Sequence, residues 1–116
     1  MNTNEKMELM ESEALVQEML RKRNLGTEGC VLTSEIARKA GLSTSDLNSF
    51  LLDQGILCRQ RGVLMPTDKN RRLGLTKQRS SFKFTAQGKL KEIVYPVWTK
   101  KGVVFLEGVL KIRIKI

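Results

Sequence analysis

The sequence contains no histidine, and its two cysteines, Cys30 and Cys58, lie too far apart for a Cys-x-x-Cys pair. The usual zinc sites need one or the other, so we expect no metal site. Both cysteines are interpreted as small core or strand residues, with a disulfide between them the less favoured alternative. A Gly-rich phosphate loop and paired carboxylates beside a nucleophile are also missing. We therefore expect no catalytic residues, no cofactor and no enzyme.

Long apolar runs are absent as well. No stretch approaches the ~20 residues that a membrane-spanning helix needs. The amino terminus is acidic, where a signal peptide would place positive charge before an apolar segment. We therefore expect a cytoplasmic protein that does not bind membrane. With 116 residues, the chain has room for one compact core and an appended helix.

Positive charge is abundant but unevenly placed. The net charge is +9, yet residues 1–30 carry four basic and six acidic side chains, against seventeen and six in residues 31–116. Residues 59–91 contain ten basic side chains, and Asp68 is the only acid among them. Such density favours a polyanionic partner, although basicity alone also fits a membrane surface or solubility.

Residues 4–23 have the features of a helix. They contain no Gly or Pro, and their acids come early while Arg21, Lys22 and Arg23 come late, as the helix dipole favours. The apolar stripe is wider than an exposed helix tolerates, so we expect this helix to pack on the domain or on a second copy. A homodimer through residues 4–23 is therefore left open.

The segment from Thr33 to Leu51 predicts two short helices joined by a tight turn. Thr33 or Ser34 is expected to cap the first helix, which ends at Gly41 in the left-handed conformation. Ser43 or Thr44 is expected to cap the second. The small Ala37 and the apolar anchors follow the spacing of a DNA-binding helix-turn-helix; these anchors are Ile36, Ala40, Leu42, Leu47 and Phe50.

Strand-like patterns follow from Ile56. Two short runs flank a tight turn at Arg61-Gly62, and a basic turn or short helix covers residues 67–74. Residues 75–84 and 90–98 form a longer hairpin, in which Pro96 restricts the second strand to an edge or strand end. Thr99 caps a final helix through residue 110, and the alternating tail 111–116 is expected to be a half-buried edge strand.

These elements predict an α+β fold, a winged helix-turn-helix with an added amino-terminal helix and a basic β-hairpin. We expect three parts: residues 1–24 as a helix for packing or dimerisation, residues 31–110 as the winged domain, and residues 111–116 as a tail.

The second helix of the pair is the candidate for reading DNA in the major groove. The base-reading candidates are the polar side chains that the core does not need, namely Thr44, Ser45, Asn48 and Ser49. The helix carries no Arg, which predicts modest base discrimination. Contacts to the DNA backbone are expected from Ser43, Arg38, Lys39, Arg59, Arg61, Arg71, Arg72, Lys77, Arg79 and Lys83. The alternative is a protein-docking module with ordinary caps and a solvated basic face.

Three segments, taken in order, resemble a known family. They are Phe-Leu-Leu-Asp-Gln-Gly-Ile-Leu at 50–57, Met-Pro-Thr at 65–67 followed by Gly-Leu at 74–75, and Trp-Thr-Lys-Lys-Gly at 98–102 before an apolar helix. From Thr33 to Leu110 the chain resembles the carboxy-terminal domain of phage antirepressor proteins, the KilA C-terminal family.

The resemblance implies a phage or prophage transcription regulator that binds double-stranded DNA, with antirepression exerted through contact with a repressor protein. The sequence shows no separate amino-terminal regulatory domain and carries an Ile/Lys tail, both unlike the family's usual pattern. We therefore expect an isolated domain or a stand-alone regulator. The alternative is an interaction module that captures a repressor or partner subunit through the Met-rich residues 4–23 without contacting DNA.

Overall fold

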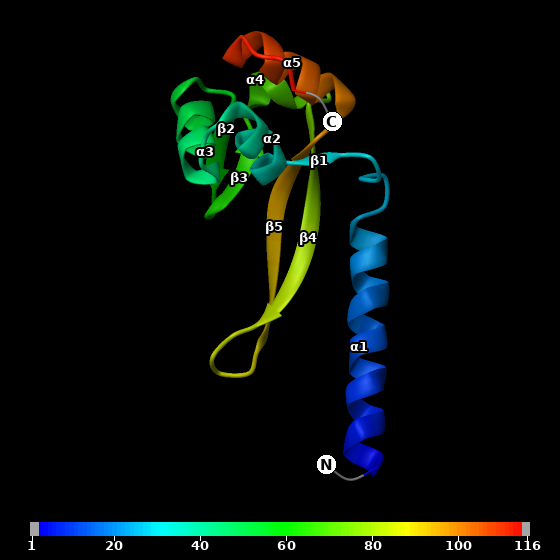
Figure 1. Ribbon diagram of the computed structural model, residues 1–116. Coiled ribbons are helices and arrows are strands. Elements are labelled where there is room, and N and C mark those ends of the chain that lie inside the picture. The colour runs from blue at the N-terminus through cyan, green and yellow to red at the C-terminus, as the bar shows by residue number, and fades with distance from the viewer. Residues whose placement is uncertain (1–2, 115–116) are drawn as a thin grey trace.

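A computed structural model describes residues 3–114, with side chains described from Glu13 onward. Helices and antiparallel strands alternate along the chain, which confirms the α+β class. Figure 1 shows their arrangement. In chain order the elements are α1 (Thr3–Arg23), β1 (Val31–Leu32), α2 (Thr33–Ala40), α3 (Thr44–Asp53), β2 (Leu57–Gln60), β3 (Val63–Pro66), α4 (Asp68–Arg71), β4 (Thr76–Phe84), β5 (Leu90–Trp98) and α5 (Lys100–Leu110).

Both predicted hairpins are present. Strands β2 and β3 form a separate two-stranded sheet, while β4 and β5 pair along their whole length in a sheet of order β1-β5-β4. Strand β5 is therefore the middle strand, so Pro96 is not on an edge strand, and it lies near the end of β5, the other position that the sequence allowed. Because β1 pairs only with Val97 and Trp98, Pro96 has a strand neighbour on the β4 side alone.

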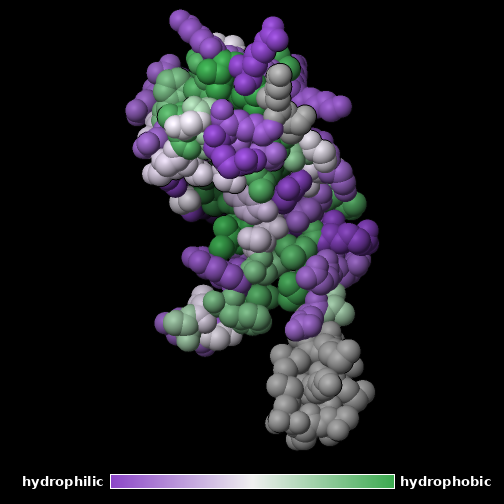
Figure 2. All heavy atoms as spheres, in the orientation of Figure 1, coloured by the Kyte–Doolittle hydropathy of each residue, from purple (hydrophilic) through white to green (hydrophobic). Residues whose placement is uncertain are grey.

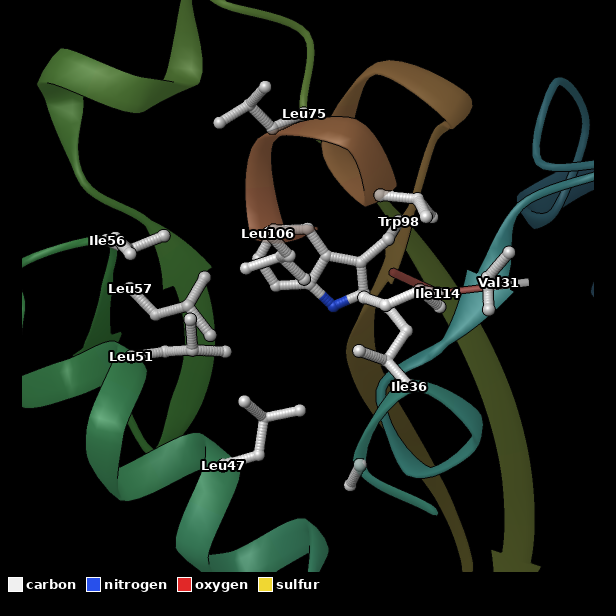
Figure 3. Packing of buried hydrophobic residues seen from close by; sticks show 12 residues of the cluster. Val31, Ile36, Leu47, Leu51, Ile56, Leu57, Leu75, Trp98, Leu106 and Ile114 are labelled. Carbon is white, nitrogen blue, oxygen red and sulfur yellow. The ribbon is translucent and has the colours of Figure 1, made fainter. Parts of the chain in front are cut away.

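The core lies where α2, α3 and α5 meet the carboxyl end of β5. Figure 3 shows the Trp98 ring among Ile36, Leu106 and Ile114, and all four side chains are buried. Leu47 and Leu51 of α3 extend this cluster toward β2. Burial of these apolar side chains is the main force that holds the paired helices on the sheet.

Thr33 does not cap α2 as expected. The residue preceding the helix is Leu32, and no side chain caps this end. The Thr33 hydroxyl instead accepts a hydrogen bond of 2.9 Å from the indole N–H of Trp98 inside the core. A buried indole N–H needs such a partner, so the structure uses this hydroxyl for the core and leaves the helix end without a side-chain cap.

The tail also differs from expectation. Residues 111–114 contain no strand, and residues 115–116 lie outside the described part of the chain. Ile114 is buried against the core, and its backbone N–H donates to the Glu107 carboxylate at 2.9 Å. Within residues 111–114, Ile112 and Ile114 therefore pack against the core cluster without strand pairing.

Helix α1 lies beside the long β4–β5 hairpin (Figure 1). The Asn24 amide holds its carboxyl end against the open edge of β4, since it accepts from the Ser80 N–H (2.7 Å) and donates to the Ser80 carbonyl (3.1 Å). Arg23 stacks over the Phe82 ring and pairs with Glu92. The carboxyl-terminal end of α1 thus packs on the sheet, where the helix protects an edge strand.

The rest of the apolar stripe of α1 is less well covered. Val16 and Leu20 are half-buried, whereas Leu15 and Met19 are exposed. On the solvent side, Arg21 donates two hydrogen bonds to Glu18, which lowers the pKa of that carboxyl. Much of the apolar surface predicted from the sequence therefore remains open to solvent within the single chain.

Candidate nucleic-acid interface

The turn between α2 and α3 has the local geometry that the sequence predicted. Gly41 adopts φ +73°, a left-handed conformation that residues with a Cβ resist, and Leu42 N–H then bonds to the Ala37 carbonyl at 2.9 Å. Two residues later the Ser43 hydroxyl accepts from the Asp46 N–H at 3.0 Å and caps α3. These contacts start α3 almost immediately after α2 ends.

Helix α3 presents opposite faces to the core and to solvent. Leu47 and Leu51 are fully buried, and Ile36 and Ala37 of α2 pack into the same cluster. Three of the four candidate base-reading residues, Thr44, Ser45 and Ser49, are exposed. The exposed amino-terminal turn of α3 therefore carries hydroxyl groups, which can donate and accept hydrogen bonds, beside free backbone N–H groups.

Asn48 is the exception among the four. It is half-buried, and its Oδ1 atom is buried without a hydrogen-bond partner among the described residues. The side chain borders a hollow of about 190 Å³ between the helices and the sheet, lined also by Leu64, Tyr95 and Pro96. In this conformation Asn48 faces the interior of the protein, so contact with a base edge would require its side chain to rotate outward.

The β2–β3 hairpin, here called the wing, lies next to α3. Its two-residue turn has Arg61 at φ +52° and Gly62 at φ +79°, the pattern of a type I′ turn. Arg59 and Arg61 are exposed on it. Arg38 and Lys39 are exposed in the last turn of α2, just before the turn that leads to α3. Together α2, α3 and the wing form one lobe that carries four of the candidate cations (Figure 1).

Two other candidate cations hold the loop that follows α1. Arg79 donates to the Thr27 carbonyl at 2.6 Å and to the Thr27 hydroxyl at 3.1 Å, and Lys77 donates to the Gly26 carbonyl at 2.6 Å. Arg79 is half-buried as a result, while Lys77 stays exposed. Both side chains therefore have a structural role, fixing the α1–β1 loop to β4, that the sequence did not reveal.

The remaining candidates lie elsewhere on the molecule. Arg71 and Arg72 are exposed on and just after α4, where they border an open hollow together with Asp68 and Lys69. Lys83 is the second-last residue of β4, and the distal end of the β4–β5 hairpin projects away from the lobe (Figure 1). Lys69 was missed by the sequence reasoning, although its spacing of three residues from Arg72 places both on one side of a helical turn.

Features of other functional classes are sparse in the described chain. Within residues 3–114, Cys30 and Cys58 are free thiols, and no group of three potential metal ligands gathers in one place. None of the described helices is long and apolar enough to cross a membrane.

Comparison with known proteins gives one match. A sequence profile described as phage antirepressor protein KilAC domain matches residues 9–112, which includes most of α1 and all of the core cluster except Ile114. No curated protein and no solved structure is significantly similar to the chain.

Proposed function

Because the chain belongs to the phage antirepressor KilAC domain family, we propose that it is a phage- or prophage-type transcription regulator whose lobe binds double-stranded DNA. The observation that carries the proposal is the exposed amino-terminal turn of α3, set in a lobe with four exposed cations. The protein would act in the host cytoplasm, where phage DNA is transcribed. The winged helix-turn-helix interpretation is part of the proposal, supported by the order helix, tight turn, helix, hairpin.

In the proposed mechanism, one set of residues binds the DNA phosphates and another set contacts the bases. Arg38, Lys39, Arg59 and Arg61 would contact phosphates on either side of α3, and the capped start of α3 with Ser43 would add backbone N–H groups and a hydroxyl. Thr44, Ser45 and Ser49 would face base edges in the major groove. Since hydroxyls accept and donate alike, they discriminate bases weakly, and most of the affinity would come from the cations.

The other residues predicted to contact the DNA backbone are less compatible with binding through the lobe. Lys77 and Arg79 already serve the α1–β1 loop, so any phosphate contact would compete with their carbonyl partners. Arg71, Arg72 and Lys83 lie outside the lobe and remain sequence predictions.

Binding to mixed-sequence duplexes at several salt concentrations tests the proposal. If about five phosphates are neutralised, affinity should fall several-hundred-fold between roughly 50 and 200 mM salt, because each contact contributes a slope near −0.9 in log affinity against log salt. Affinity that does not change with salt would refute DNA binding by this surface.

Paired variants locate the footprint. Arg59→Ala with Arg61→Asn removes two wing charges, and Asn suits the positive φ of residue 61. This variant should reduce the salt slope by about 0.9 for each phosphate that the wing no longer neutralises. Lys100→Ala with Lys101→Ala removes the same charge from exposed positions on α5 and should leave the slope unchanged. Equal slopes for the two variants would mean that net charge, rather than the lobe, binds DNA.

A second candidate function is capture of a repressor or partner subunit without DNA contact. The exposed Leu15 and Met19 on α1 favour it, because a partner helix could cover them. In that case Leu15→Glu would abolish binding to the repressor, and the wing variant would leave it intact. The opposite pattern would exclude α1 as the capturing surface.

A further inference from the structure

The long hairpin and α1 form an arm that projects from the lobe. The molecule measures 57 × 28 × 26 Å, and this arm lies along its long axis (Figure 1). Arg23 is level with Glu92 and Phe82. From that level the helix advances about 1.5 Å per residue and the strand about 3.3 Å, so Leu15 is level with the hairpin turn at residues 85–88. Residues 3–12 of α1 therefore extend beyond the turn, where no other described segment accompanies them.

Large apolar side chains are exposed on this arm. Phe84 is 70% exposed and Leu90, its partner across the hairpin, is 41% exposed. Leu15 on α1, level with the hairpin turn, is 66% exposed. Figure 2 shows hydrophobic residues over the distal hairpin and the adjoining part of α1. Three large apolar side chains are thus exposed to water on two segments of the projecting arm, where a partner could cover them.

The arm also carries two segments of opposite charge. Residues 3–13 contain four glutamates and one lysine, a net charge of −3, and residues 83–91 contain three lysines and no acid, a net charge of +3. Within one chain the acidic segment extends past the basic turn instead of covering it. The two segments therefore match in number of charges and lie at different levels of the arm.

We propose that the arm binds the arm of a second copy in an antiparallel, twofold-symmetric dimer. In that arrangement the overhanging acidic part of each α1 lies over the basic hairpin turn of the partner, and the apolar side chains at Leu15, Phe84 and Leu90 are buried between the copies. A twofold interface must be complementary to itself. The arm meets this requirement because it carries an acidic and a basic segment of equal and opposite charge.

Particle mass measured without nucleic acid tests the dimer independently of DNA binding. Sedimentation equilibrium at roughly 10 μM should give about twice the 13.2 kDa of one chain. Leu15→Glu places a charge in the interface and should give a monomer with an unchanged circular dichroism spectrum. Val104→Glu, at a 65% exposed position on α5, is the matched control and should stay dimeric. A monomeric wild type, or equal masses for the two variants, overturns the proposal.

A charge exchange tests the antiparallel arrangement itself. One variant carries Glu5→Lys, Glu8→Lys and Glu11→Lys, and the other carries Lys83→Glu, Lys89→Glu and Lys91→Glu. Each variant alone places like charges together in both halves of its homodimer and should be monomeric. A mixture should form a heterodimer, because each acidic or basic segment then meets its opposite on the other chain. Failure of the mixture to associate, or dimerisation of either variant alone, overturns the arrangement.

Discussion

At the scale of single residues, Gly102 shows how closely α5 approaches the rest of the core. The helix begins at the cap Thr99, whose hydroxyl accepts from the Gly102 N–H at 3.1 Å and donates to the Gly74 carbonyl at 2.7 Å. A Cβ at position 102 would lie 2.0 Å from the Leu75 carbonyl oxygen and 3.0 Å from the Trp98 ring. Glycine is required there because backbone, and not a movable side chain, occupies the space.

We therefore expect Gly102→Ala to destabilise the protein by about 1–3 kcal/mol or more, since α5 must shift away from Leu75 and open the core around Trp98. Gly108→Ala, on the same helix with nothing within 4 Å, is the control and should stabilise by about 0.5–1 kcal/mol through helix propensity. Urea unfolding of the two variants measures both effects. Equal stabilities would show that α5 does not contact Leu75 as described.

At the scale of elements, the features that the sequence revealed are those encoded locally. Ser43 caps α3 through a residue three positions away, Gly41 ends α2 with its own φ, and Arg61-Gly62 closes a two-residue turn. Thr99 likewise caps α5 through Gly102. In each case the residue and its hydrogen-bond partner lie close together in the sequence, so the sequence pattern was enough to predict the contact.

The features that the sequence could not reveal depend on partners far along the chain. The Thr33 hydroxyl bonds to Trp98, 65 residues away, and that contact outweighs its local capping preference. Arg79 bonds to Thr27 across 52 residues, so a side chain assigned to phosphate serves a loop instead. For the candidate site, exposure of Thr44, Ser45 and Ser49 followed from helical periodicity, whereas the inward turn of Asn48 depends on the sheet beneath it.

The Asn24 side chain attaches the carboxyl end of α1 to strand β4. Asn24→Ala removes both hydrogen bonds to Ser80, so the edge of β4 loses its cover at that point and the carboxyl end of α1 is less firmly held. The Ser80 amide should exchange with solvent faster than in the wild type, while the Leu47 amide in α3, bonded to the Ser43 carbonyl, should keep its rate. Hydrogen exchange by NMR measures both amides. An unchanged rate at Ser80 would mean that other contacts hold α1 there.

At the scale of the whole molecule, the proposed DNA-binding lobe and the proposed dimer arm occupy different regions. The lobe groups α2, α3 and the wing around the core, while the arm places Leu15 and the hairpin turn away from it (Figure 1). Substitutions in one region should therefore leave the other folded. DNA binding and dimerisation can then be measured separately. Dimerisation still affects DNA binding, because it brings two lobes into one particle that can contact the same duplex.

If both lobes of a dimer contact one duplex, the monomeric Leu15→Glu variant should neutralise about half as many phosphates as the wild type. Its slope of log affinity against log salt should then be roughly half the wild-type slope, because the slope follows the number of neutralised phosphates. The control Val104→Glu, which has the same added charge, should keep the wild-type slope. Fluorescence anisotropy with a labelled duplex at several salt concentrations measures all three proteins. A full slope for monomeric Leu15→Glu would mean that one lobe provides the entire DNA contact and that the arm assembles the protein for another purpose.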